Sequence, residues 1–178
     1  MIKALILAAG LGTRLKPITD NLPKPMVEVG DKPVIAYVVD NLTHYDIGDI
    51  IVNVHHLPSA VAKYFGPKLY YFYEPYLLGE KKTVALLHSL IGFDNLVVTN
   101  GDTISNVNLD KMISFHFKNN ASLTRFMVNN RYAGTKILSF GNSINEIDYT
   151  QEDGYYFDIG TKEKLELPKK YYETRTTS

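Results

Sequence analysis

The sequence predicts an α/β fold with a mostly parallel central sheet, and three observations favour this class. Short apolar runs alternate with segments of helical spacing over the first two thirds of the chain. Polar or glycine-rich turns follow the first and the fourth apolar runs. The chain has 178 residues, which is the usual length of one domain. Strands that alternate with helices form parallel sheets, and such sheets bind ligands outside the carboxyl ends of their strands.

Each expected strand in this part of the chain is a short apolar run bounded by turn residues. The expected helices carry apolar residues at helical spacing, and Pro33 and Pro58 stand where a helix begins. Glycines and prolines punctuate the long loop between the first strand and the first helix. The strands are expected at residues 2–7, 49–54, 68–73 and 96–99, and the helices at residues 34–44, 58–66 and 83–90.

The pattern changes after Asp102, where short β-rich runs and Gly- or Asn-rich turns follow one helical segment. These runs predict a small antiparallel C-terminal patch beside the parallel core. The charged tail from Lys162 is expected to form a terminal helix that breaks at Pro168. The helical segment is residues 109–117, and the strands are residues 122–128, 135–140, 143–147 and 155–157. The whole is expected to be a Rossmann-like three-layer α/β/α arrangement.

The composition excludes several classes of function. Nineteen Lys and Arg balance nineteen Asp and Glu, so no global positive field indicates a nucleic-acid partner. The absence of cysteine excludes disulfides, a thiolate nucleophile and Cys-ligated metals. No apolar run approaches the roughly 20 residues of a spanning helix. The apolar N-terminus is short, contains Lys3 and lacks a cleavage pattern, so we expect a cytoplasmic protein with no membrane partner.

A glycine-rich loop from Gly10 to Arg14 follows the first expected strand. Glycines let backbone N–H groups approach a phosphate closely, and the guanidinium of Arg14 suits a bidentate phosphate contact. The alternative is a tight surface turn with a solvated arginine. The loop is not a P-loop, which needs G-x-x-x-x-G-K-[ST]. It is not a dinucleotide-binding G-x-G-x-x-G either, because Leu15 stands at the third glycine position.

Lys24 lies between Pro23 and Pro25, further along the same loop. Each proline fixes its own φ and restricts the residue before it. A lysine held in this way loses less entropy when it binds an anion. On this feature alone, an exposed loop lysine is the simpler interpretation.

The run from Leu7 to Met26 resembles the signature of the sugar-1-phosphate nucleotidylyltransferases, also called NDP-sugar pyrophosphorylases. It matches every specified position of L-A-A-G-x-G-T-R-[LM]-x-P-x-T-x-x-x-P-K-P-[ML]. Four further segments are similar to the family's. Residues 29–35 resemble the family segment that leads into its first long helix. Residues 74–79 resemble the segment that borders the nucleotide base. Residues 100–102 and 156–161 resemble the segments that carry its two metal-binding aspartates.

The resemblance implies one nucleotidyltransferase domain over residues 1–178, of the nucleotide-diphospho-sugar transferase type. Residues 1–110 would be the nucleotide-binding core, and residues 111–178 a shortened acceptor-binding part with a C-terminal tail. The family joins an NTP to a sugar 1-phosphate and releases pyrophosphate. It serves nucleotide-sugar and cell-surface polysaccharide biosynthesis. The implied partners are an NTP, a phosphorylated small-molecule acceptor and Mg²⁺, and a homo-oligomer is left open.

The site residues follow from the resemblance position by position. Arg14, Lys24 and Asp102 would be catalytic, with Arg14 holding the leaving pyrophosphate and Lys24 neutralising the reacting phosphates. Asp102 and Asp158 would bind Mg²⁺ through carboxylate oxygens, which this hard cation prefers. Taken alone, either aspartate is as easily a turn residue. The nucleotide-binding residues would be Leu7, Ala8, Ala9, Gly10, Gly12, Thr13, Arg14, Lys24, Glu74, Gly79, Asn100 and Gly101.

Two departures from the family pattern bear on substrate recognition. After Gly79 the family continues with small residues, whereas this chain has Glu80-Lys81-Lys82, which would otherwise form the solvated first turn of a helix. The interval between the two aspartates is shorter than in typical members and lacks the family's glutamate-lysine and glycine-tyrosine segments. Lys136 is the best substitute for the missing lysine there, and Arg125 and Arg131 are further anion-binding candidates.

Two alternatives therefore stand beside sugar-phosphate transfer. The chain could act on a small non-sugar phosphate such as phosphocholine, which needs less enclosing structure. It could instead be a catalytically inactive nucleotide-binding homologue. The histidines support no separate site. His55 and His56 are neighbours at a strand end and point to opposite faces, and His116 lies between two phenylalanines in a helix.

Overall fold

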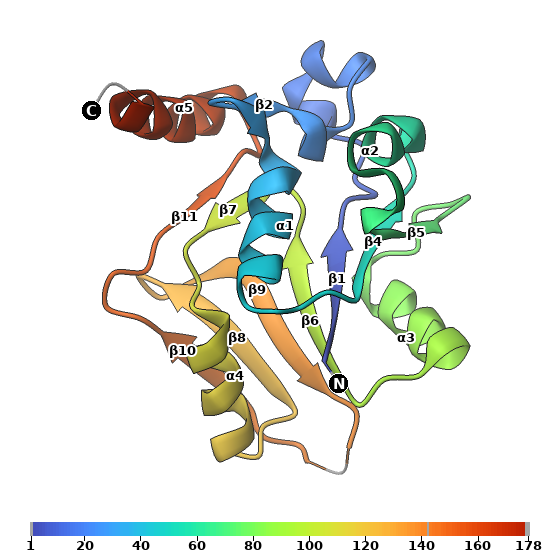
Figure 1. The fold of residues 1–178 in the computed structure, drawn as a ribbon, viewed down its shortest axis with the longest axis vertical. Coiled ribbons are helices and arrows are strands. Elements are labelled where there is room, and N and C mark those ends of the chain that lie inside the picture. Colours follow the sequence, from blue (N-terminus) through green and yellow to red (C-terminus); the bar gives the residue numbers. More distant parts are fainter. Residues whose placement is uncertain (1, 142, 177–178) are drawn as a thin grey trace.

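A computed structural model describes residues 2–141 and 143–176 (Figure 1). Seven strands are β1 Lys3–Leu7, β4 Ile50–Val54, β5 Tyr70–Tyr73, β6 Asn95–Asn100, β8 Leu123–Val128, β9 Arg131–Ser139 and β10 Glu146–Thr150. They form one sheet in the order β10-β8-β9-β6-β1-β4-β5. β1 pairs in parallel with both β4 and β6, and β5 continues the parallel set beside β4. β9 is antiparallel to both β6 and β8, and β10 lies parallel to β8.

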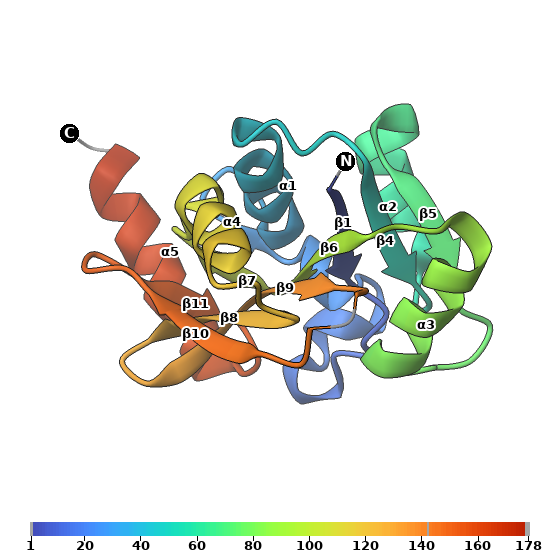
Figure 2. The same ribbon diagram turned by 90° about the horizontal axis from the view of Figure 1, so that it is seen from below.

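Helices cover both faces of this sheet (Figure 2). The helices of the two faces are α1 Val34–His44, α2 Pro58–Phe65, α3 Glu80–Ile91 and α4 Leu109–Lys118. A fifth helix, α5 Lys162–Thr176, packs in a separate apolar cluster. Alternate residues of β1 show the two faces. Ala4 and Ile6 join the apolar cluster that contains α1, α2 and α4, whereas Leu5 joins the cluster that contains α3. This arrangement confirms the three-layer α/β fold with a mostly parallel sheet.

Two short antiparallel pairs lie outside the main sheet. β7 Thr103–Ser105 pairs with β11 Tyr156–Asp158, and β2 Glu28–Val29 pairs with β3 Lys32–Pro33. The loop between β1 and β2 contains three short 3₁₀ turns, at Thr13–Leu15, Ile18–Asp20 and Lys24–Met26. A third apolar cluster, which includes Leu15, Ile104 and Ile159, joins this loop to β7 and to the chain after β11. None of the described helices is both long and apolar enough to cross a bilayer.

The C-terminal strands differ from their expected bounds for identifiable reasons. β9 begins at Arg131 instead of residue 135, because Asn129 and Asn130 both adopt positive φ and make a tight hairpin with β8. The strand expected at 143–147 is β10 at Glu146–Thr150. Ser143 and Asn145 instead bond the carbonyls of Asn120 and Asn119, which follow α4. The expected antiparallel patch is found in part: β9 is antiparallel to β6 and β8 within the main sheet, and β11 is antiparallel to β7. The expectation is wrong for β10, which pairs with β8 in parallel.

The helices follow the sequence closely, with two exceptions. α3 begins three residues before the expected Thr83, so Lys81 and Lys82 form its exposed first turn. The expected break of the terminal helix at Pro168 is wrong, because α5 continues through this residue to Thr176. Pro168 is buried, as is Leu165 one turn earlier. Burial of this face favours a continuous helix, although proline cannot donate a backbone hydrogen bond.

Candidate active site

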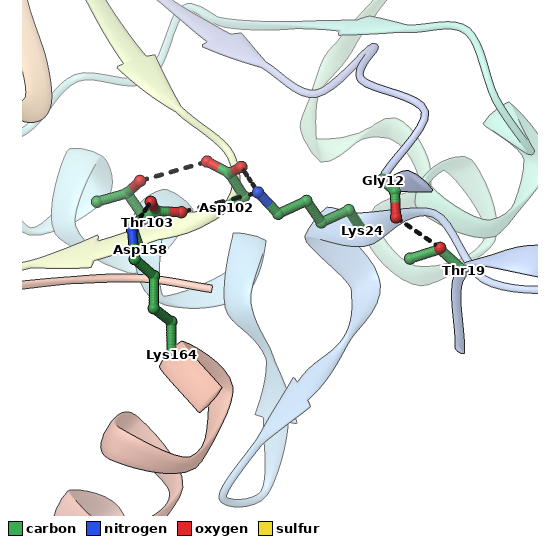
Figure 3. A network of polar contacts seen from close by, with 7 residues as sticks. All are labelled: Gly12, Thr19, Lys24, Asp102, Thr103, Asp158 and Lys164. Carbon is green, nitrogen blue, oxygen red and sulfur yellow. Dashed lines mark hydrogen bonds and ion pairs between the residues drawn. The ribbon is translucent and has the colours of Figure 1, made fainter. Parts of the chain in front are cut away.

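The glycine loop leaves the carboxyl end of β1 and folds back on the chain segment that carries Lys24. The N–H of Ala8 donates to Asn53 Oδ1 at 2.7 Å, which ties the start of the loop to the neighbouring strand β4. Gly12 adopts φ +64°, and a Cβ there would lie 2.9 Å from Thr19 Cγ2 and 3.0 Å from Lys24 Cβ. Thr19 Oγ1 donates to the carbonyl of Gly12 at 2.8 Å (Figure 3). Glycine is therefore required where the loop meets the Lys24 turn.

Lys24 lies between the two candidate metal-binding aspartates (Figure 3). The residue is 9% exposed, so the conformation expected from its flanking prolines is fixed by packing as well. Its Nζ donates a hydrogen bond to Asp102 Oδ2 and lies 3.7 Å from Asp158 Oδ1. The interpretation as an exposed loop lysine is wrong, because the ammonium group is held at the centre of a charged cluster.

The β7–β11 pair brings together two aspartates that are separated by 55 residues in the chain. Asp102 immediately precedes β7, Asp158 ends β11, and Asp158 is the register partner of Thr103. The N–H of Ile159 donates to the carbonyl of Asp102 at 3.2 Å. Gly101 lets the chain pass close to the glycine loop, because its N–H donates to Leu7 O and a Cβ would lie 3.1 Å from that oxygen.

A second ammonium group pairs with Asp158, and a guanidinium lies near the turn that follows it. Lys164 Nζ, from the first turn of α5, lies 2.8 Å from Asp158 Oδ2. A Cβ on Gly160 would lie 3.4 Å from Arg14 Nη2, so the guanidinium of Arg14 reaches the same turn. Burial alone would raise the pKa of Asp158, but the hydrogen bond from Lys164 and the charge of Lys24 outweigh it and lower that pKa. The two carboxylates therefore pair with two ammonium groups, and Arg14 lies close to the turn after Asp158.

Two adjoining cavities open beside this cluster. The first, of about 360 Å³, is lined by Leu7, Ala8, Ala9, Gly10, Lys24, Pro25, Asn53, Glu74, Leu77, Gly79, Glu80, Asn100 and Asp102. The second, of about 340 Å³, is lined by Gly10, Leu11, Gly12, Thr13, Arg14, Lys24, Leu77, Asp102 and Gly160. The cavities share Gly10, Lys24, Leu77 and Asp102. Every residue expected to bind nucleotide lines one of the two cavities, with the exception of Gly101.

Glu74 lines the first cavity, but its carboxylate is engaged within the protein. The residue is 1% exposed. Its Oε1 accepts from Asn53 Nδ2 at 2.9 Å and from Thr83 Oγ1 at 2.5 Å, and its Oε2 accepts from the N–H of Leu78 at 3.1 Å. Glu74 thus organises the wall of the cavity through β4, α3 and the segment between them, instead of offering a free carboxylate.

The donor set fits Mg²⁺. Asp102 and Asp158 both present carboxylate oxygens to the single ammonium group of Lys24, so one cation already occupies the space between them. Hard oxygen ligands suit Mg²⁺, which commonly uses one or two carboxylates together with substrate phosphates. Among the described residues, no group of three or more His, Asp and Glu side chains gathers as a metal cage. The remaining ligands would therefore come from phosphates and water.

The candidates for acceptor binding are less well placed. Arg125 is paired with Asp148 at 2.8 Å and with Glu146 at 3.4 Å, on the far strands of the sheet. Arg131 is an exposed residue at the tip of the β8–β9 hairpin. Lys136 is mostly buried on β9 and forms an ion pair with Glu80, which lines the first cavity. Of the three, only Lys136 reaches the site, and it does so through Glu80.

The sequence alone did not indicate the parts played by Asn53 and Lys164. Asn53 is a buried polar residue in the middle of an apolar strand, and this unusual position was the available signal. Lys164 gave no signal, because its contact with Asp158 depends on how α5 follows β11. The histidines have structural partners, as expected. His55 Nδ1 lies 2.8 Å from Glu74 O, and His56 Nε2 lies 2.9 Å from Thr19 O.

Comparison with known proteins places this site in context. Residues 3–141 match the family model described as "Nucleotidyl transferase". Over 126 residues the chain is 36% identical to a mannose-1-phosphate guanyltransferase of Aspergillus oryzae, covering 66% of this chain and 35% of that protein. Over 140 residues it is 31% identical to a UTP–glucose-1-phosphate uridylyltransferase of Synechocystis, covering 69% and 36%. The chain thus spans about a third of the length of the curated relatives it matches.

The structural similarity to one solved protein covers almost the whole chain. A UDP-glucose pyrophosphorylase from Acinetobacter baumanii superimposes with a TM-score of 0.82 and 19% sequence identity. The match covers 97% of this chain and 93% of that chain. At this identity the likeness concerns the fold, and it includes the region after residue 141 that lies beyond the family match.

Proposed function

Since the chain belongs to the nucleotidyl transferase family, we propose that it transfers a nucleoside monophosphate from an NTP to a sugar 1-phosphate, giving an NDP-sugar and pyrophosphate. The observation that carries the proposal is the position of Lys24 between Asp102 and Asp158, beside the glycine loop. The names of the relatives support it, because the Aspergillus and Synechocystis proteins are both named as sugar-1-phosphate nucleotidyltransferases.

In this reaction a phosphate oxygen of the acceptor attacks the α-phosphorus of the NTP, and the bond from that phosphorus to the β-phosphate oxygen breaks. Pyrophosphate carries away the bonding electron pair, and no covalent enzyme intermediate is needed. Catalysis then depends on positioning and on charge neutralisation. Mg²⁺, held by Asp102 and Asp158, would supply Lewis-acid stabilisation of the phosphate charge.

The chain's own residues divide the remaining work. Backbone N–H groups from Ala9 to Thr13 would cradle the triphosphate, since this loop borders both cavities. The ammonium of Lys24 would neutralise charge on the reacting phosphates once it is released from the aspartates. Arg14, which lines only the second cavity, would hold the departing pyrophosphate.

A pyrophosphate-release assay tests this proposal, with each of the common NTPs against a panel of hexose 1-phosphates in the presence of Mg²⁺. Turnover with at least one pair is expected. Asp102→Asn should reduce that turnover by roughly a hundredfold or more while the circular dichroism spectrum stays unchanged, because the amide removes one anionic ligand. No turnover by the folded protein with any pair would sink the proposal.

The short region between Asp102 and Asp158 supports a second candidate, transfer to a small non-sugar phosphate. Phosphocholine and similar phosphomonoesters belong in the same acceptor panel for this reason. Turnover with these phosphomonoesters alone would show that the acceptor is not a sugar phosphate, whereas the proposed nucleotidyl transfer would stand. An inactive nucleotide-binding protein would bind NTP in calorimetry without any turnover.

A further inference from the structure

The two cavities give a bound nucleotide a direction, and this inference rests on the function proposed above. Arg14, Gly12 and Thr13 line only the second cavity, where cations and backbone N–H groups suit phosphates. Gly79 and Glu80 line only the first cavity, which Arg14 does not border. A nucleotide whose phosphates lie against the glycine loop would therefore place its base toward Glu80.

Most polar side chains at that end of the first cavity are already satisfied. Asn53 uses its carbonyl for the N–H of Ala8 and its amide for Glu74. Glu74 in turn is held by Asn53, Thr83 and the N–H of Leu78. These groups shape the cavity but have little capacity left to read a base. Two lining side chains keep an unused acceptor, the amide of Asn100 and the carboxylate of Glu80, and Asn100 ends β6 beside the glycine loop, where it is the register partner of Leu7. Glu80 is therefore the candidate for reading the base.

Glu80 is oriented by Lys136, which reaches it from β9. The ion pair uses Glu80 Oε1, whereas Oε2 has no hydrogen-bond partner among the described residues. The Lys136 side chain is 16% exposed and that of Glu80 34%, so the lysine is the more firmly packed partner. The carboxylate is thus fixed from one side, and its other oxygen is available to a ligand.

We propose that Glu80 selects a guanine nucleotide. A carboxylate only accepts hydrogen bonds, and Oε1 keeps a second lone pair beside its bond to Lys136, so both oxygens can accept from two donors that lie side by side. Guanine offers such a pair in N1–H and the N2 amino group. Cytosine and adenine place a ring-nitrogen acceptor beside their single amino group, and uracil flanks its one N–H with two carbonyls. A second carboxylate oxygen would face a lone pair in each of these three bases.

Nucleotide binding by isothermal titration calorimetry tests the assignment, with GTP, ITP, ATP, CTP and UTP in Mg²⁺. ITP is the informative probe, because it is GTP without the N2 amino group. We expect GTP to bind roughly ten- to a hundredfold more tightly than the other four. In Glu80→Gln the advantage of GTP over ITP should fall to less than about threefold, because one acceptor oxygen becomes a donor. Glu28→Gln, at an exposed position on β2, is the matched control and should keep the wild-type preference.

Three results would overturn the assignment: tighter binding of another nucleotide, equal binding of GTP and ITP, or an unchanged preference in Glu80→Gln. Its failure is distinguishable from failure of the proposed function. Transfer from a pyrimidine NTP would support the function and overturn the guanine assignment. Selective GTP binding without transfer to any acceptor would support the guanine assignment and overturn the proposed function. Absence of all nucleotide binding would overturn both proposals.

Discussion

Lys24 neutralises two carboxylates that would otherwise repel each other. Its side chain is 11% exposed, and those of Asp102 and Asp158 are 26% and 33% exposed. Lys24→Met should lower the free energy of unfolding by roughly 1–3 kcal/mol, because two partly buried negative charges lose their partner. Added Mg²⁺ should restore much of this loss, since it can occupy the vacated position. Urea unfolding with and without Mg²⁺ measures both effects.

The control for this change is Lys16→Met. Lys16 lies in the same loop but is exposed, and its ion pair with Asp20 at 3.1 Å is open to solvent. This variant should change the unfolding free energy by less than about 0.5 kcal/mol and show no added response to Mg²⁺. A Lys24→Met protein that is as stable as the wild type without Mg²⁺ would contradict the role assigned to the ammonium group.

His116 predicts a pH dependence of stability that is separate from the candidate active site. It is fully buried, and its ring nitrogens lie 2.8 Å from Thr124 Oγ1 and 2.7 Å from Ser139 Oγ. Ser139 Oγ donates to Asn95 Oδ1, so the Nε2–H of a neutral His116 donates to Ser139. Burial lowers the pKa of His116 below its ordinary value of 6.5.

The sign of this effect follows from proton counting. Below about pH 6.5 the unfolded chain binds a proton at His116 that the folded protein does not, so the free energy of unfolding falls as the pH falls. The slope from this one group is at most about 1.4 kcal/mol per pH unit. Urea unfolding at pH 7.5 and 5.5 should show a smaller loss in His116→Gln than in the wild type. Equal losses would mean that His116 is protonated in the folded state.

At the scale of elements, helix α5 secures the second candidate metal ligand. Leu165 is 2% exposed and packs in the cluster that contains Ile104 and Ile159, next to Asp158. Leu165→Ala should lower the unfolding free energy by roughly 2–4 kcal/mol, because it leaves a cavity in this cluster. It should also weaken Mg²⁺–NTP binding, since β11 and Lys164 are held in place through the same contact. Denaturant unfolding and calorimetry measure the two effects.

Leu167 is the matched control on the same helix, because it is 60% exposed. Leu167→Ala should alter stability by less than about 0.5 kcal/mol and leave nucleotide binding unchanged. If Leu165→Ala lost stability but bound Mg²⁺–NTP as the wild type does, α5 would be structural and would play no part in positioning Asp158.

The sequence predicted helices and strands best where the local apolar pattern matches the face that the element buries. The helix expected at residues 34–44 is α1 at Val34–His44, because its apolar spacing matches the face it buries. β10 was displaced because Ser143 and Asn145 serve the end of α4, a long-range contact that no local pattern contains. The motifs located the glycine loop, Lys24 and both aspartates, but the ion pairs of Asp158 with Lys164 and of Glu80 with Lys136 arise only from tertiary packing.

At the scale of the whole molecule, the N-terminal and C-terminal strands share one sheet and one apolar cluster. β9, from the C-terminal part, pairs with β6 of the N-terminal part along five register positions, from Asn95 with Ser139 to Thr99 with Thr135. Phe126 and Ile137 are fully buried in the same apolar cluster as Ala4 and Val97. The proposed nucleotide and acceptor parts are therefore expected to be one folding unit, in agreement with the single domain proposed for residues 1–178.

This shared sheet predicts one cooperative unfolding transition. In native-state hydrogen exchange, the most protected amides of β1 and β8 should open with the same free energy and the same urea dependence, because neither part keeps its core without the other. A fragment of residues 1–110 should fail to fold, since it would expose the edge of β6 and the apolar face that β9 and β8 cover. A chain that ends after residue 161 is the control and should retain the sheet, because α5 lies outside it. Separate opening energies for β1 and β8, or a folded 1–110 fragment, would show instead that the nucleotide-binding part is an independent domain.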